Sequence, residues 1–184
     1  MVEPSRKTES ILIQDPHGKR ATLSLSPGMS IAIIGLDGTG KSTATEMLEK
    51  ALAEAGLPTT CFHWYSATQT CFRVPVQVLR NRNSRQSVQI FDRSIFDNFA
   101  VWSQRIGNVA LRNGLLRSAA WLAQRLYPRF DAIVHLTAAP DVIARRRPEM
   151  TPRQIALGQE AYAVLSEVLK TQPLDTVSIR RAAA

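Results

Sequence analysis

Cysteine, histidine and long hydrophobic runs are scarce in this sequence of 184 residues, which has only two cysteines and three histidines. Cys61 and Cys71 form no CxxC pair, and the histidines lack the spacing of zinc ligands, so we expect neither a disulfide framework nor a zinc site. Both thiols should be reduced and partly buried. The sequence contains no stretch of about 18 apolar residues, which a membrane-spanning helix would need, and residues 1–15 lack the apolar core of a signal peptide. These absences predict a cytoplasmic protein with no membrane partner.

Acidic residues are also in short supply, since 15 Asp and Glu stand against 23 Lys and Arg and give a net charge of +8. Of these cations 18 are arginines, whose planar guanidinium suits phosphate better than the point charge of lysine. The arginine excess therefore predicts a phosphate-bearing partner. A nucleic acid would be one such partner, but no known nucleic-acid-binding motif accompanies the charge, so we expect a small phosphorylated molecule.

The length predicts one domain over residues 1–184, because about 150 residues are usual for a domain and 45% of these are hydrophobic. Short apolar strands alternate with amphipathic helices, which is typical of a mainly parallel sheet with helices on both faces. We expect an N-terminal extension over 1–28, with a hairpin of strands near 11–13 and 23–25, and a short lid over 141–150. The predicted fold class is a three-layer α/β sandwich.

Apolar periodicity, capping residues and prolines predict the individual elements. Strands are expected at 30–34, 59–64, 88–91, 131–136 and 176–179, and helices at about 44–55, 141–147 and 151–170. Residues 65–87 are expected to be irregular. Asp141 should be the N-cap of the short helix, and Thr151 that of the last helix, with Gln154 completing a capping box. In the long helical region before Pro128, one stripe is expected to be buried: Leu111, Leu115, Ala119, Leu122 and Leu126.

The segment from Gly35 to Ser42 matches GxxxxGK[ST] at every fixed position. It lies between a buried strand and an amphipathic helix, the context in which this motif turns backbone N–H groups toward a polyphosphate. Lys41 is expected to reach the β- and γ-phosphates, and the Ser42 hydroxyl to help hold Mg²⁺. The sequence therefore predicts a P-loop NTPase fold with ATP and Mg²⁺ as cofactors, and the expected nucleotide-binding residues are Gly35, Asp37, Gly38, Thr39, Gly40, Lys41, Ser42 and Thr43.

A carboxylate at the end of a neighbouring strand usually completes the metal site of such a loop. Asp92 follows the apolar strand 88–91, so we expect it to hold Mg²⁺, or a water bound to the ion, together with Ser42. Arg93 beside it is expected to bind a phosphate of the acceptor. The alternative for both residues is a local turn or a surface ion pair.

Arg145, Arg146 and Arg147 lie on the short helix of the lid. Three adjacent residues cannot share one face of a helix, so at most two can point at any one ligand. We expect them to close over the transferred phosphoryl group and neutralise its charge. The alternative is a solvated basic face. With Lys41 and the pair at 92–93, these arginines make up the predicted catalytic set.

Taken in order, these features resemble the thymidylate-kinase-like branch of the P-loop nucleoside monophosphate kinases. The resemblance covers about residues 30–169 and rests on the glycine loop with its acidic Asp37, the pair Asp92-Arg93, the arginine-rich lid after 139–141, and the helix that contains Tyr162. It implies Mg-ATP-dependent phosphotransfer to a nucleoside monophosphate such as dTMP, or to a related small phosphorylated acceptor.

The resemblance also assigns roles. It implies that residues 41–43 serve ATP and Mg²⁺, that Arg93 binds the acceptor phosphate, and that a lid arginine reaches the transition state. Asp37 would contact the acceptor sugar. A homodimer formed through the long helices is implied as well.

Other hypotheses stay open. Asp92-Arg93-Ser94 is also similar to the motif of deoxynucleoside kinases, which place a catalytic carboxylate after the second strand to deprotonate a sugar hydroxyl. Here His63 stands after that strand, followed by Trp64 and Tyr65. A divergent small-molecule kinase fits the same motifs. An ATP-driven binding or motor module of the transporter type would explain the hairpin before the glycine loop, although its Leu-Ser-Gly-Gly-Gln signature is missing.

Overall fold

A five-stranded parallel sheet forms the centre of the fold, in the order β4-β5-β3-β6-β7. The computed structural model describes residues 8–14, 20–63, 69–171, 173–175 and 178–181. The strands are β3 (Ser30–Ile34), β4 (Thr59–His63), β5 (Val88–Asp92), β6 (Ala132–Thr137) and β7 (Pro173–Asp175). All residues of β3 and β5 are buried, because each strand has neighbours on both sides and helices on both faces. The predicted α/β fold with a mainly parallel sheet is confirmed.

The N-terminal extension forms the expected hairpin from β1 (Glu9–Gln14) and β2 (Arg20–Leu25). A third strand, β8 (Ser178–Arg181), pairs antiparallel with β1, so a second sheet has the order β2-β1-β8. The predicted strand at 176–179 is confirmed at residues 178–179, where β8 begins, and β8 extends two residues further, to Arg181. The chain forms β7 before residues 176–177, which lie outside the described part, and β8 after them.

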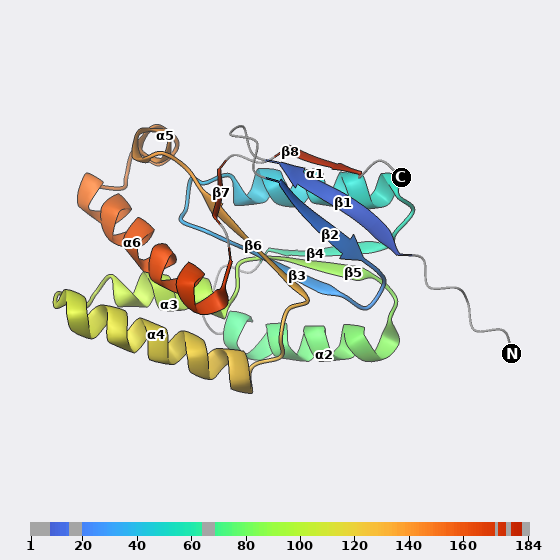
Figure 1. Cartoon of the computed structure of the whole chain (residues 1–184), viewed down its shortest axis with the longest axis horizontal. Coiled ribbons are helices and arrows are strands. Elements are labelled where there is room, and N and C mark those ends of the chain that lie inside the picture. Colours follow the sequence, from blue (N-terminus) through green and yellow to red (C-terminus); the bar gives the residue numbers. More distant parts are fainter. Residues whose placement is uncertain (1–7, 15–19, 64–68, 172, 176–177, 182–184) are drawn as a thin grey trace, which may run out of the picture.

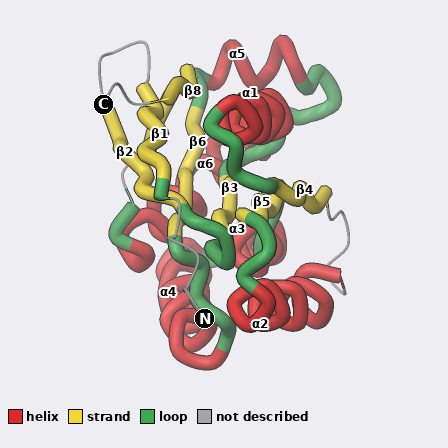
Figure 2. The backbone as a smooth tube through the Cα atoms, turned by 90° about the vertical axis from the view of Figure 1, so that its right-hand side faces the viewer, coloured by secondary structure: helices red, strands yellow, loops and turns green. Residues whose placement is uncertain are grey.

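Helices cover both faces of the central sheet (Figure 1). On one face α1 packs together with the hairpin sheet, and α2, α3, α4 and α6 lie on the other. Figure 2 shows the same layers from the side, with α5 beyond the end of the sheet near α1. The helices are α1 (Lys41–Glu54), the π-helical turn η1 (Gln69–Arg73), α2 (Val74–Ser84), α3 (Ile95–Ser103), α4 (Val109–Leu126), α5 (Pro140–Arg146) and α6 (Pro152–Leu169).

Capping residues set several helix starts. Thr151 and Gln154 form the predicted capping box of α6. The predicted N-cap of α5 is wrong, because the helix begins at Pro140 and Asp141 lies inside its first turn. Proline is favoured at the first helical position, where its missing N–H is not needed, and here it places the start before the aspartate.

The long helix α4 buries a different stripe from the predicted one. Its inward-facing residues are Arg112, Leu116, Ala120 and Ala123. The four leucines of the predicted stripe lie at the surface: Leu111 is 55% exposed, Leu115 40%, Leu122 47% and Leu126 77%. Both stripes repeat at helical spacing, so periodicity alone does not decide which one faces the core. The small alanines of the buried stripe let α4 pack closely against α3 and α6, and Arg112 is paired there with Glu160 of α6.

The segment expected to be irregular contains a helix. In α2, Val74 and Val78 lie one turn apart, are fully buried and pack against Phe91. Phe72 and Val76 are exposed on the same segment. Apolar residues on both faces hide the helical period, and this accounts for the missed element.

Cys61 and Cys71 are both partly buried, as expected, and neither forms a disulfide. In the described part of the chain, no helix combines the length and apolarity needed to cross a membrane.

Candidate active site

The glycine loop leaves β3 at the carboxyl edge of the sheet and turns sharply into α1. A Cβ atom on Gly35 would lie 2.4 Å from the carbonyl oxygen of Leu136, and the φ of 151° also disfavours any side chain. Gly40, the N-cap of α1, is left-handed with φ 94°. The turn leaves the first N–H groups of α1 without partners inside the helix, at the end where the helix dipole favours an anion. The loop therefore has the backbone geometry of a phosphate cradle.

Lys41 is buried and folds back over the loop. Its Nζ donates to the carbonyl oxygens of Gly35 at 2.7 Å and Leu36 at 3.3 Å, and lies 3.2 Å from Oδ1 of Asp37. The hydroxyl of Thr39 donates to the Leu36 carbonyl at 2.8 Å, so this predicted binding residue shapes the loop with its side chain. The lysine charge is held at the loop by three oxygens and is in place for a phosphate.

Asp92 ends β5 opposite the start of α1. Its Oδ2 accepts a hydrogen bond from the Ser42 hydroxyl at 3.0 Å and lies 3.2 Å from Nδ1 of His63. Its Oδ1 is buried and has no hydrogen-bond partner among the described residues. A carboxylate and a hydroxyl on neighbouring elements, with one carboxylate oxygen unused, fit Mg²⁺, which takes few protein ligands and completes its shell with phosphate and water oxygens. The structure brings together the two predicted metal ligands.

Arg93 is bound to Asp37 across the site. Its Nη2 lies 3.0 Å and 3.2 Å from the two carboxylate oxygens. Burial acts to raise the pKa of Asp37, but the charges of Lys41 and Arg93, with a contribution from Arg147, outweigh it and hold that pKa below its ordinary value. Asp37 is therefore ionised at neutral pH and orients two predicted catalytic cations at once.

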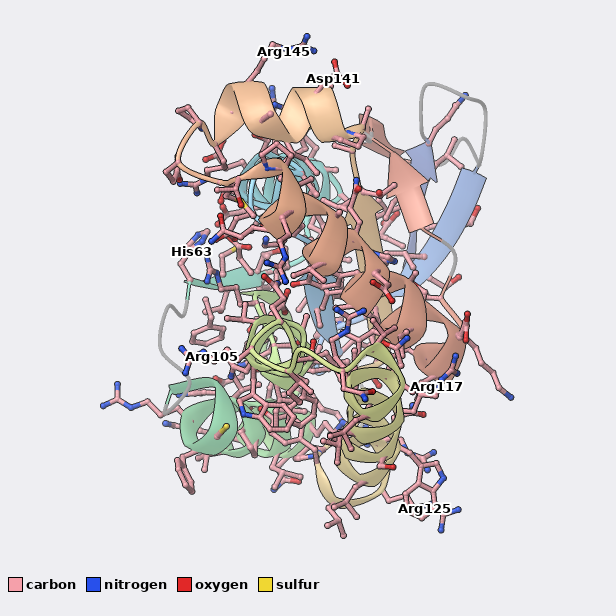
Figure 3. The ribbon with its side chains drawn as sticks, turned by 90° about the vertical axis from the view of Figure 1, so that its left-hand side faces the viewer. His63, Arg105, Arg117, Arg125, Asp141 and Arg145 are labelled. Carbon is pink, nitrogen blue, oxygen red and sulfur yellow. The ribbon has the colours of Figure 1, made fainter. Side chains whose placement is uncertain are left out.

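The lid arginines differ in position. Arg146 donates to the carbonyl oxygen of Gly38 at 3.0 Å, and the side chain of Arg147 lies 3.2 Å from where a Cβ of Gly38 would be. Arg145 is 71% exposed and pairs with Asp141 at 3.0 Å, and Figure 3 shows both at the outer surface of α5. Two of the three predicted lid residues reach the loop, and Arg145 points away from it.

These groups line one cleft of about 380 Å³ at the carboxyl edge of the sheet. Its cationic side chains are Lys41 and three arginines, against the carboxylates of Asp37 and Asp92, so the described lining carries an excess of two positive charges at neutral pH. An excess of positive charge in a cleft walled by protein of low dielectric constant attracts phosphate strongly. The lining residues are Asp37, Gly38, Gly40, Lys41, Ser42, Thr43, Asp92, Arg93, Arg146 and Arg147.

Beneath the glycine loop lies a buried hydrogen-bond network that is not predicted from the sequence. Asp97 accepts hydrogen bonds from the N–H of Gly35 at 3.3 Å, the N–H of Ser94 at 2.7 Å and the hydroxyl of Tyr162 at 2.7 Å. Burial and the adjacent Asp97 carboxylate raise the pKa of Tyr162 well above its ordinary value, so the hydroxyl stays protonated and donates. The only sequence signal for Asp97 is its place three residues after Ser94, the spacing of a capping box.

Trp64 and Tyr65 lie outside the described residues. His63, which precedes them, is partly exposed at the end of β4 beside Asp92.

In fold the chain is similar to deoxyadenosine kinase from M. mycoides. The structure of that enzyme with bound dATP gives a TM-score of 0.51 at 16% sequence identity, covering 80% of this chain and 91% of that chain. A second structure of it, with the products dCMP and a flexible dCDP bound, gives 0.50 at 14% identity, covering 80% and 90%. No protein-family model and no curated protein match the sequence. At these identities the likeness shows a shared fold.

Proposed function

We propose that the chain is an ATP-dependent kinase that uses Mg²⁺ and phosphorylates a small acceptor of the nucleotide class. The observation that carries the proposal is the convergence of Lys41, the Ser42–Asp92 pair, Arg93 and two lid arginines on one cleft. A phosphate cradle alone would suit any nucleotide-binding protein. The added arginines from two other elements supply the charge that phosphoryl transfer requires around the transferred group.

Each residue has a role that follows from its place. The loop N–H groups and Lys41 would hold the β- and γ-phosphates of ATP, and Ser42 and Asp92 would hold Mg²⁺, which would supply positive charge beside the phosphates. Arg146 and Arg147 lie over Gly38, where they shield the transferred group from water and offset its charge. Catalysis then consists of positioning and electrostatic stabilisation, and no covalent enzyme intermediate is needed.

A nucleoside monophosphate, such as dTMP, is the acceptor that the charges favour. Arg93 faces the cleft from the strand-end opposite the loop, where an acceptor phosphate would meet the γ-phosphate of ATP. Asp37 holds that guanidinium in place, which reduces the cost of ordering it on binding. The acceptor phosphate would displace or share this contact.

A deoxynucleoside is the second candidate, supported by the similarity in fold to a deoxyadenosine kinase. A neutral hydroxyl acceptor needs a base, and His63 beside Asp92 is the titratable group at the end of β4 in the described chain.

ADP formation from Mg-ATP tests both candidates, with dTMP, other nucleoside monophosphates, thymidine and deoxyadenosine offered separately. Stimulation by a monophosphate supports the first candidate, and stimulation by a nucleoside the second. Hydrolysis that needs no acceptor would contradict a kinase and favour an ATP-driven module. Lys41→Ala is the control for each reaction.

We propose a second copy of this chain as the protein partner, bound through α3 and α4. The exposed leucine stripe of α4 is continued on α3 by Val101 and Trp102, 54% and 47% exposed. At about 200 Å² for each fully exposed side chain of this size, the patch offers on the order of 600 Å², near the roughly 800 Å² per partner of a stable interface. A dimer would bury two such stripes against each other.

Sedimentation of the native chain and of Leu115→Asp and Leu122→Asp tests this interface. The native protein is expected to sediment as a dimer and both variants as monomers. Leu79→Asp is the matched control, since this leucine is 51% exposed on α2, away from the patch, and the variant should stay dimeric. A monomeric native protein would refute the interface.

A further inference from the structure

A second cavity lies on the other side of the glycine loop from the phosphate cleft, between the loop, β6 and α6. Its volume is about 250 Å³. The described lining residues are Leu36, Thr39, His135, Leu136, Thr137, Gln159, Tyr162, Ala163 and Ser166, and none of them carries a charge at neutral pH when His135 is neutral. None of the roles proposed for the phosphate cleft uses this cavity.

We propose that this cavity is a binding site for a small, neutral, planar heterocycle of the nucleobase kind. The proposal concerns binding and does not depend on the kinase activity.

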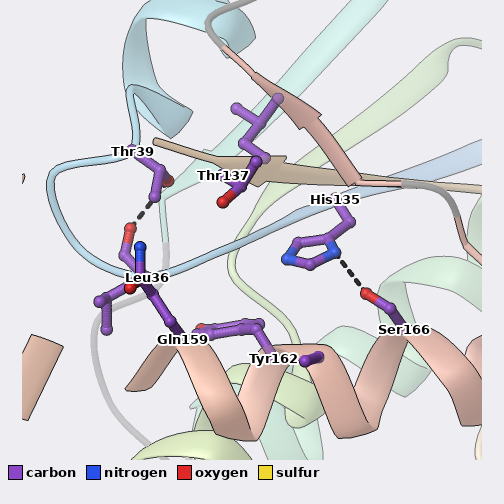
Figure 4. A pocket seen from close by; sticks show the side chains of 9 residues that line it. Leu36, Thr39, His135, Thr137, Gln159, Tyr162 and Ser166 are labelled. Atoms are coloured by element: carbon purple, nitrogen blue, oxygen red, sulfur yellow. Dashed lines mark hydrogen bonds between the residues drawn. The ribbon is translucent and has the colours of Figure 1, made fainter. Parts of the chain in front are cut away.

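Several polar side chains that line the cavity can make further hydrogen bonds. Ser166 occupies Nδ1 of His135, which leaves the other ring nitrogen to meet a ligand in the cavity. The amide nitrogen of Gln159 donates to the carbonyl oxygen of Ala138 at 2.9 Å, which leaves its side-chain oxygen to accept. The hydroxyl of Thr137 adds a group that can donate or accept. Figure 4 shows the imidazole between Ser166 and the space enclosed by Thr137, Gln159 and Tyr162.

Aromatic and aliphatic side chains form the walls between these groups. The rings of His135 and Tyr162 are stacked, with centroids 5.6 Å apart and planes 25° apart. Leu36 from the loop closes another side, where it packs so tightly on α6 that a Cβ on Gly158 would lie 2.5 Å from its methyl carbon. Rigid aromatic and aliphatic walls with a few polar groups are the usual lining of a small-molecule pocket.

The electrostatics favour a neutral ligand. Burial lowers the pKa of His135 to about 4, so the imidazole is uncharged at neutral pH and offers one nitrogen as a donor or an acceptor, according to tautomer. No described lining group attracts an anion or a cation, which separates this cavity from the phosphate cleft. The size fits one or two fused rings, because the space is equivalent to about eight waters at roughly 30 Å³ each.

Calorimetric titration of the protein without nucleotide tests the proposal with adenine, adenosine and uracil as probes. The nucleoside separates a site for a free base from one that admits a sugar. Binding of at least one probe is expected, together with a shift of the His135 ring signals in the NMR spectrum. The sequence has only three histidines, so these signals can be assigned by substitution.

A matched pair of substitutions on α6 places the ligand. Ala163→Leu fills the cavity and is expected to weaken probe binding at least about tenfold. Ala156→Leu adds the same volume at an exposed position of α6 outside the described lining, and should leave binding unchanged. Equal binding by the two variants, or no binding of any probe at about 1 mM, would overturn the proposal. Loss of probe binding in the presence of Mg-ATP, with no shift of the His135 NMR signals, would also overturn the proposal, because the probe would then occupy the nucleotide cleft.

Discussion

The guanidinium of Arg93 is held by the carboxylate of Asp37, a residue of the glycine loop 56 positions earlier in the chain. Arg93 adopts a left-handed backbone with φ 115°, a strained conformation for an arginine. This backbone conformation turns Arg93 back toward the loop, and the ion pair with Asp37 stabilises it there. Strain of about 1–3 kcal/mol at a single residue is typical of sites that hold a group ready for a ligand.

Lys41→Ala is expected to lower kcat by about a thousandfold, because removal of one preorganised charge at developing phosphate charge has effects of this size. Steady-state ADP release at saturating acceptor measures it. Lys50→Ala, on the exposed side of α1, is the control and should retain native kcat. Normal turnover in Lys41→Ala would contradict the proposed cleft.

Asp92→Asn is expected to raise the Mg²⁺ concentration needed for half-maximal activity by about tenfold or more, since a neutral amide is a weaker ligand for a hard cation. Activity measured against Mg²⁺ at fixed ATP gives the shift. The control is Asp141→Asn on the outer face of α5, which should follow the native curve. An unchanged Mg²⁺ dependence in Asp92→Asn would remove this residue from the metal site.

Single alanine variants of the three lid arginines should differ in kcat. Arg146→Ala and Arg147→Ala are expected to lower kcat by about a hundredfold, because their side chains line the phosphate cleft. Arg145→Ala should keep native kcat, since its side chain faces solvent beside Asp141. Equal loss in all three would show that the lid acts through its overall charge.

Acid should destabilise the fold through His135. Its pKa of about 4 lies below the ordinary value near 6.5, so the unfolded chain binds more protons between these limits. His135 therefore leaves the free energy of unfolding unchanged above pH 6.5. As the pH falls toward 4, that free energy decreases, by about 3 kcal/mol at full extent. Urea unfolding at pH 7, 5.5 and 4.5 measures the loss. His135→Gln should show a smaller decline over this range, and parallel declines would exclude the histidine as the cause.

The sequence predicts the glycine loop, its flanking strand and helix, and the carboxylate at 92, because each depends on local geometry that a short motif encodes. The positions of Arg146 and Arg147 over the loop follow only in part. Adjacency limits how many arginines can face a ligand, but which two do so depends on where α5 begins, and Pro140 sets that point.

The parts that escape prediction depend on contacts distant in sequence. Asp97 and Tyr162 support the loop through hydrogen bonds between three elements, and no local pattern marks such a network. In α4, the sequence shows two stripes at helical spacing, and contacts with neighbouring helices decide which one is buried, so the predicted leucine stripe is wrong. The pairing of β8 with β1 likewise joins segments that no short-range rule connects.

That last pairing makes the order of synthesis matter. β1 and β2 are made first, yet β1 keeps one open edge until residues 178–181 have been added, nearly the whole described chain later. An unpaired edge strand is a template for pairing with another chain. Until β8 has been synthesised, β1 is therefore open to pairing with another chain, and the pairing of β8 closes that edge of β1.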